Sequence, residues 1–134
     1  MKNRIPQLVN ILSKLDEVAF AYLHGSSLTS VSPRDLDIGV FIYPAIYHKL
    51  ADTGEVNIGF AIPLEMKLDK MIDIKTDVQI LNAAPLSFRH RIVKEGVLLI
   101  DNDTQLRCDF EYLSRYQYFD FQPRRAEYLK EVLT

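Results

Sequence analysis

The chain has 134 residues, of which 48% are hydrophobic and 25% are charged. This length fits a single domain spanning residues 1–134, and the composition excludes a disordered chain or a fibrous repeat. A net charge of −2 argues against a long nucleic acid as a direct ligand, because surfaces that follow a phosphate backbone carry an excess of Lys and Arg.

The pattern of the chain is that of a protein of the cytoplasm. Cys108 is the single cysteine, so an internal disulfide is excluded. The N-terminal residues lead into an amphipathic segment and not into an apolar export signal. Since no apolar run approaches the roughly 20 residues that span a bilayer, we expect no membrane contact.

The first third of the chain predicts one helix and two strands. Apolar residues recur at helical spacing over residues 5–16, which predicts an amphipathic helix. Residues 18–23 are continuously apolar, as in a strand buried on both faces, and a sharp turn follows at Gly25. Residues 28–34 are small and hydroxyl-rich, which predicts a short helical turn or loop, and residues 35–42 alternate as a strand with one buried face.

Broken helices are expected over residues 44–72. Helical spacing dominates this segment, but Gly54, Gly59 and Pro63 interrupt it. Residues 74–81 alternate again and predict a third strand.

The remaining chain predicts a helix over residues 85–95, a short strand over residues 97–100 and a long C-terminal helical segment that is kinked or restarted around Pro123. The fold class is therefore α+β (mixed α/β), with a small mixed β-sheet of about four strands flanked by helices. Aromatic residues between Phe110 and Phe121 exceed what one buried helix stripe needs. We expect most of them in the core, and a partner surface is the alternative.

Acidic residues at alternate positions of a predicted strand indicate a functional site, because Asp is a poor strand former. Asp35 and Asp37 point to the same face, and Gly39 is expected to leave space against that face of the sheet. If the strand over residues 74–81 neighbours this one, Asp77 adds a third carboxylate to the same face.

These three carboxylates predict a metal site. Carboxylates placed so close raise one another's pKa unless a cation neutralises them. Hard oxygen ligands select Mg²⁺ or Mn²⁺, which typically keep positions open for substrate phosphates. A nucleoside triphosphate is therefore the expected substrate, and Asp77 is the candidate to take the proton of an acceptor hydroxyl.

The turn after the first strand supplies a complementary phosphate site. Glycine at position 25 lets backbone amides approach a phosphate, and Ser26 adds a hydroxyl donor. His24 adjoins this turn, but it lacks metal-ligand spacing to other histidines and is expected to be structural.

Two stretches of the chain resemble the DNA polymerase β-type nucleotidyltransferase superfamily in its minimal (MNT) branch. One is Gly25-Ser26 followed, after eight residues, by Asp35-Leu36-Asp37-Ile38. The other is TDVQILNAAP at residues 76–85, which resembles the strand that carries the third carboxylate and the Asn-x-x-Pro helix start behind it.

The resemblance implies a nucleotidyltransferase fold with Mg²⁺ or Mn²⁺ as cofactor, ATP as substrate and Asp35, Asp37 and Asp77 as metal-binding and catalytic residues. MNT proteins often partner a HEPN-domain toxin, and the implied activity is transfer of AMP to a tyrosine of that toxin, which makes the MNT protein its antitoxin. The implied nucleotide-binding residues are Gly25, Ser26, Ser27 and Arg34. The family often has Ala-Arg-Gly after Gly-Ser, whereas this chain has Leu28-Thr29-Ser30, so Arg34 is the candidate phosphate-binding cation.

Two other functions remain open from the sequence. A binding module with the MNT fold would neutralise the toxin by direct complex formation, with weak or no catalysis. A small-molecule nucleotidyltransferase of the aminoglycoside-modifying kind is less favoured, because such enzymes usually carry an added helical domain.

Overall fold

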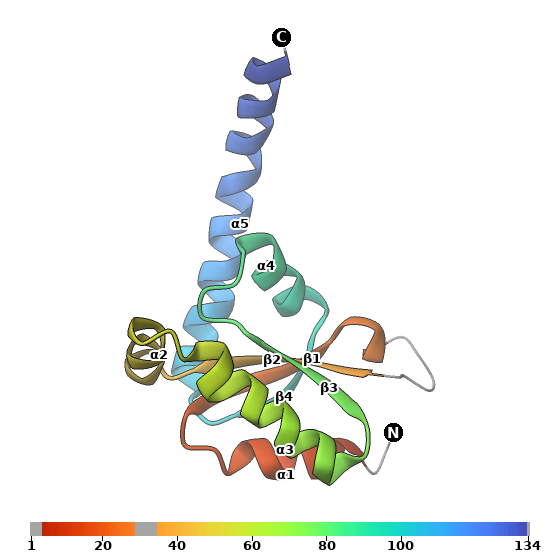
Figure 1. Ribbon diagram of the computed structural model, residues 1–134. Coiled ribbons are helices and arrows are strands. Elements are labelled where there is room, and N and C mark those ends of the chain that lie inside the picture. Colours follow the sequence, from red (N-terminus) through yellow and green to blue (C-terminus); the bar gives the residue numbers. More distant parts are fainter. Residues whose placement is uncertain (1–3, 29–34, 134) are drawn as a thin grey trace.

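A computed structural model describes residues 4–28 and 35–133, without the side chains of residues 26–27, 120–129 and 131–133. A four-stranded sheet in the order β3-β2-β1-β4 lies at its centre, with helices on both sides (Figure 1). The strands are β1 (Val18–His24), β2 (Asp35–Ile42), β3 (Lys75–Ile80) and β4 (Val97–Asp101). β1 pairs antiparallel with β2 and β4, and β2 pairs parallel with β3, so the sheet is mixed as predicted.

The helices also follow the predicted order. They are α1 (Arg4–Ser13), the 3₁₀ helix η1 (Gly25–Leu28), α2 (Pro44–Asp52), the π-helical η2 (Val56–Ala61), α3 (Ile62–Ile72), α4 (Leu86–Glu95) and α5 (Thr104–Leu133). Gly54 follows α2 with a positive φ of 70°, which accounts for the predicted break there. Pro63 lies in the first turn of α3, which follows η2 without a break, so the chain changes from π-helix to α-helix next to this residue and does not leave the helix. α5 is one helix through Pro123, so the expected restart is wrong.

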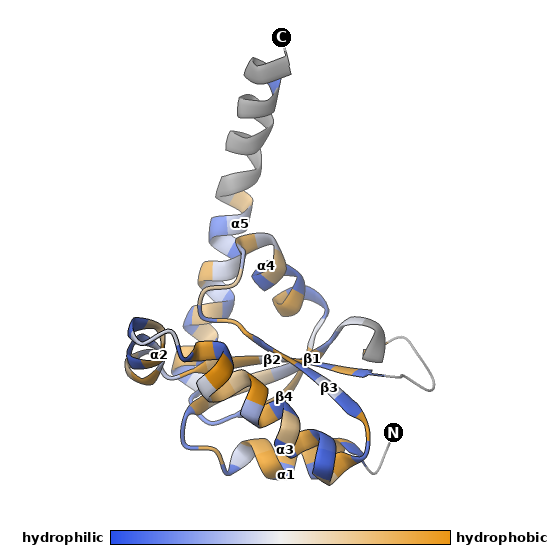
Figure 2. Cartoon of the chain, in the orientation of Figure 1, coloured by the Kyte–Doolittle hydropathy of each residue, from blue (hydrophilic) through white to orange (hydrophobic). Residues whose placement is uncertain are grey.

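Two hydrophobic layers enclose the sheet. On one face, α1 and α3 cover the apolar side of β2, where Leu36, Ile38 and Val40 are completely buried. In Figure 2 both helices alternate hydrophobic and hydrophilic residues, as expected of helices that cover one side of a sheet. On the other face, α4 and α5 pack over Phe20, whose ring stacks on Phe41 at 4.7 Å between centroids. No helix in the described residues is long and apolar enough to span a bilayer.

The space expected beside Gly39 is filled by protein. A Cβ at this position would lie 3.1 Å from the Leu81 Cδ2 atom, and Leu81 is completely buried. Gly39 therefore allows Leu81 to pack closely on the sheet, and the group that lies in the expected space is this core side chain.

The free edge of β3 is closed by carboxylates of α3. Asp69 Oδ1 accepts hydrogen bonds from Thr76 N–H at 2.8 Å and from the Thr76 hydroxyl at 2.9 Å, and Glu65 Oε1 accepts one from Val78 N–H at 2.8 Å. Glu65 and Asp69 are four residues apart on α3, a rise of about 6 Å. Thr76 and Val78 are two residues apart on β3, a rise of about 6.6 Å, so each carboxylate lies opposite one N–H group. These contacts satisfy the outward N–H groups of the edge strand and hold β3 in its register.

Replacing Asp69 with Ala is expected to lower the free energy of unfolding by about 1–3 kcal/mol, since two donors of Thr76 lose a charged acceptor. Asp69→Asn keeps an acceptor oxygen and is expected to lose less. Urea unfolding followed by circular dichroism measures both, with the exposed Asp52→Ala as control. Equal stability of Asp69→Ala and Asp52→Ala would contradict the assigned role.

Candidate active site

Two of the predicted carboxylates are neighbours across the parallel strand pair. Asp37 of β2 is in register with Asp77 of β3, and residues paired in this way point to the same face of a sheet. Asp37 is half-buried and Asp77 is exposed. The alternation of the sequence thus correctly predicted that Asp37 and Asp77 lie on the same face of the sheet.

Asp35 lies at the outer end of this arrangement. It is the first residue of β2, it is exposed, and its register partner on β3 is Lys75. It shares its face with Asp37 but directly follows residues 29–34, which are outside the described part of the chain. The predicted phosphate-binding Arg34 lies in that segment, and Ser26 and Ser27 are described only as backbone of η1.

The Gly-Ser turn packs directly against Asp37. β1 ends at His24, the register partner of Asp37, and Gly25 follows with a positive φ of 71°. A Cβ at position 25 would collide with the Asp37 Oδ2 atom and would lie 3.1 Å from Asp37 Cγ. Only glycine combines this backbone conformation with this approach. The Gly25 turn and the Asp37 carboxylate therefore adjoin one another.

His24 lies among the charged groups of the site. It is 8% exposed, and its ring meets that of Phe88 edge to face at 5.4 Å. Burial lowers the pKa of His24 below its ordinary 6.5, the carboxylates of Asp37 and Asp77 counteract this shift, and Arg91 adds to it. Sequence reasoning expected His24 to be structural or exposed and noted that it adjoins the turn; the structure adds that it is buried beside the carboxylates.

Gln79 supports the exposed carboxylate. Its Nε2 donates a hydrogen bond to Asp77 Oδ2 at 3.4 Å, from the next position on the same face of β3. This contact orients Asp77, and the alternation of β3 would have predicted it.

The donor set suits a hard divalent cation. Within the described residues, no group of three His, Cys, Asp or Glu side chains is placed to hold a metal ion by itself. Mg²⁺ commonly uses one or two protein carboxylates and completes its coordination with substrate phosphates and water. The Asp37 and Asp77 pair meets that requirement.

A cavity of about 350 Å³ adjoins this site. Its walls come from the end of β1, from η1 and from one side of α4, and the lining residues are His24, Gly25, Leu28, Phe88, Arg91, Ile92 and Glu95. It shares His24 and Gly25 with the site and lies between the Gly25 turn and α4.

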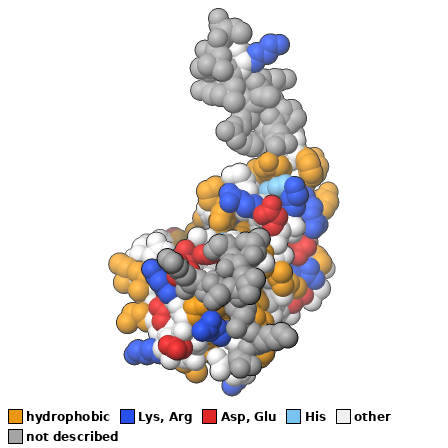
Figure 3. Space-filling model, turned by 90° about the vertical axis from the view of Figure 1, so that its right-hand side faces the viewer, with side chains coloured by type: hydrophobic (Ala, Val, Ile, Leu, Met, Phe, Trp, Pro, Cys, Tyr) orange, Lys and Arg blue, Asp and Glu red, His pale blue; other side chains and the backbone are white. Residues whose placement is uncertain are grey.

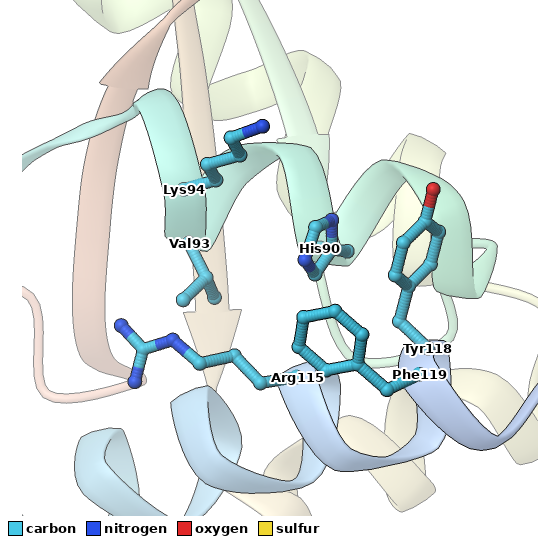
Figure 4. Close-up of a pocket in the computed structure, with 6 residues that line it drawn as sticks. All are labelled: His90, Val93, Lys94, Arg115, Tyr118 and Phe119. Carbon is cyan, nitrogen blue, oxygen red and sulfur yellow. The ribbon is translucent and has the colours of Figure 1, made fainter.

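A larger cavity of about 600 Å³ lies between α4 and α5, lined by residues that are not those of the carboxylate face (Figure 4). His90 from α4 stacks on Tyr118 from α5 at 3.8 Å between ring centroids, and Lys94 and Arg115 also line the space. In Figure 3, hydrophobic and basic side chains lie close together on the surface below the undescribed side chains of α5.

The sequence matches the family model described as polymerase beta, nucleotidyltransferase, over residues 6–105. The chain therefore belongs to the polymerase beta nucleotidyltransferase family. No curated protein matches the sequence.

Solved structures of toxin–antitoxin complexes share the fold. A chain of the MntA-HepT toxin–antitoxin crystal structure is 18% identical with a TM-score of 0.67, and the match covers 100% of both chains. A chain from the complex of a tri-AMPylated Shewanella oneidensis HEPN toxin with its MNT antitoxin is 19% identical with a TM-score of 0.68, covering 99% of this chain and 98% of that one. A chain from a toxin–antitoxin structure with AMP-PNP is 21% identical with a TM-score of 0.66, covering 99% and 98%. These matches confirm the predicted nucleotidyltransferase fold.

Gly25→Ala is expected to reduce nucleotidyl transfer about a hundredfold, because the methyl group displaces the Asp37 carboxylate. Gly54→Ala is the matched control: Gly54 has nearly the same φ, 70° against 71°, but a Cβ there meets nothing within 4 Å. Both variants carry the strain of a left-handed Ala, and only the first disturbs the site. Thermal unfolding measures the backbone strain in both variants, and transfer assays measure the effect of displacing Asp37. Equal activity of Gly25→Ala and Gly54→Ala would refute the contact between position 25 and Asp37.

Proposed function

We propose that this chain is a Mg²⁺-dependent adenylyltransferase that transfers AMP from ATP to a tyrosine of a partner HEPN toxin, and so acts as its antitoxin. The observation that supports it most directly is the pairing of Asp37 with Asp77 beside Gly25. This arrangement combines anionic ligands for a cation with backbone donors for a phosphate. The family supports nucleotidyl transfer as the reaction class.

Each group has a defined part in the proposed reaction. Asp37 and Asp77, with Asp35 at the outer end of β2, would hold Mg²⁺ together with the substrate phosphates, and the metal would supply charge neutralisation there. The Gly25 turn, with Ser26 and Ser27, binds the triphosphate. Asp77 accepts the proton of the acceptor hydroxyl, whose oxygen bonds to the α-phosphorus while the bond to the bridging oxygen breaks and pyrophosphate leaves.

The acceptor is inferred from the structural neighbours. They include an MNT antitoxin in complex with a tri-AMPylated HEPN toxin and a toxin–antitoxin structure with AMP-PNP. This chain covers nearly their whole length, which supports a single domain over residues 1–134 and the same type of partner. The reaction is proposed to take place in the cytoplasm.

The function is tested with the purified chain, its HEPN partner, ATP and Mg²⁺. Wild type is expected to add AMP to the partner, as mass spectrometry detects, whereas Asp35→Asn, Asp37→Asn and Asp77→Asn each lose about a hundredfold or more of the rate, since each removes a charge from the site. Asp52→Asn, an exposed change on α2, is expected to leave the rate unchanged. An unmodified partner with folded wild type would reject the proposal.

A binding module is the second candidate, and the exposed face of α5 favours it. Tyr112, Tyr116 and Phe119 are 61–64% exposed, so the expectation that most of these aromatic residues lie in the core is wrong for them. Tyr and Phe side chains are enriched at interface centres. If cells carrying the toxin survive equally with wild type and with Asp77→Asn, neutralisation by binding replaces catalysis as the function.

A further inference from the structure

The carboxylate face needs a cation other than the metal. A nucleoside triphosphate brings several negative charges to a face that already carries Asp35, Asp37 and Asp77, and uncompensated like charges repel. In the described part of this face, backbone N–H groups of the turn are neutral donors, and Lys75 is the register partner of Asp35 at the outer end of β2. The phosphates that lie toward α4 require a different cation.

Arg91 occupies the position where such a cation is needed. It is an exposed residue of α4 that lines the 350 Å³ cavity opposite Gly25 and Leu28. Gly25 packs against the Asp37 carboxylate and also lines the cavity, so the cavity adjoins the carboxylate face at Gly25 and reaches Arg91 on α4. A triphosphate with its α-phosphate at the carboxylates would extend into this space.

Two charge relationships support this placement. His24, at the centre of the site, interacts electrostatically with Asp37 and Asp77 and also with Arg91. The ion pairs recorded among the described residues all join Arg107 or Arg115 to acidic residues around α5, and Arg91 takes part in none of them. Arg91 thus interacts electrostatically with the same residue, His24, as the two carboxylates do, and its guanidinium is available to a ligand.

Guanidinium chemistry fits the task. Its planar fork donates paired hydrogen bonds to phosphate oxygens and stays protonated at all physiological pH values. Glu95, one turn further along α4, lines the same cavity and is the charge that opposes an anion there. The cavity thus contains one residue that would favour and one that would disfavour phosphate binding.

We propose that Arg91 binds the phosphates of ATP that leave as pyrophosphate, in the cavity between the Gly25 turn and α4. This inference rests on the proposed function, because it assigns a residue to the triphosphate of that reaction. It gives this chain a phosphate-binding arginine on α4, downstream of the third carboxylate.

The test is a calorimetric titration of the full-length chain with Mg²⁺ and α,β-methylene ATP, an analogue that cannot transfer AMP. Arg91→Ala is expected to weaken its binding about 10- to 100-fold, the usual effect of removing a charged hydrogen-bond partner. AMP, which lacks the leaving phosphates, is expected to bind wild type and Arg91→Ala with equal affinity. Arg91→Lys keeps the charge without the planar fork, and its affinity for the analogue is expected to lie between those of wild type and Arg91→Ala.

Two further variants provide matched controls on the same helix. Lys94→Ala removes a cation that lines the other cavity, and it is expected to bind the analogue as wild type does. Glu95→Gln removes the opposing charge and is expected to tighten binding a few-fold. Unchanged thermal unfolding of Arg91→Ala shows that its effect is on binding alone.

The outcomes separate this inference from the proposed function. Wild-type affinity in Arg91→Ala, with normal binding by wild type, overturns the role of Arg91 and leaves nucleotidyl transfer standing. An equal loss for AMP and for the analogue also overturns it, since the contact would then lie outside the leaving phosphates. A wild-type chain that binds no analogue with Mg²⁺ overturns the proposed function and this inference with it.

Discussion

The parallel pairing of β2 with β3 is the constraint on which the candidate site depends. A slip of one residue would turn Asp77 to the opposite face and separate it from Asp37. Three features hold the register: Thr76 and Val78 are buried against α3, the α3 carboxylates accept their outward N–H groups, and Asn82 forms two hydrogen bonds of 2.9 and 2.7 Å with the backbone of Ile42. The position of a reactive carboxylate is therefore set by core and edge contacts that take no part in the chemistry.

One face of the sheet serves both as core and as site. Toward the end of β2, Phe41 packs with Phe20 and with Phe110 of α5, at 4.7 and 5.3 Å between centroids. Toward its start, the same face carries Asp37 and stays open to the cavity beside Gly25. Because the aromatic end fixes β1 and β2 to α5, the polar end can remain uncovered without loss of the fold.

Sequence patterns predicted what depends on neighbours along the chain. Alternation identified β2 and β3 and the face of Asp37, and the apolar run identified β1, because strand periodicity follows directly from backbone geometry. Side-chain contacts between elements escaped prediction, among them Leu81 on Gly39 and Asp69 on Thr76. On α5, Tyr116 was expected in the core but is 61% exposed, whereas Ser114 is completely buried. Helical spacing alone does not show which side of α5 faces the rest of the protein.

Helix α4 links the site to the long C-terminal helix. Phe88, Arg91, Ile92 and Glu95 follow the spacing of one helix side and face the cavity beside the Gly25 turn. His90, Val93 and Lys94 line the cavity shared with α5, where His90 stacks on Tyr118. The position of α4 over the sheet is thus set from the α5 side. α5 consequently helps to determine where Arg91 lies, although none of the α5 side chains that the structure describes lines the cavity beside Gly25.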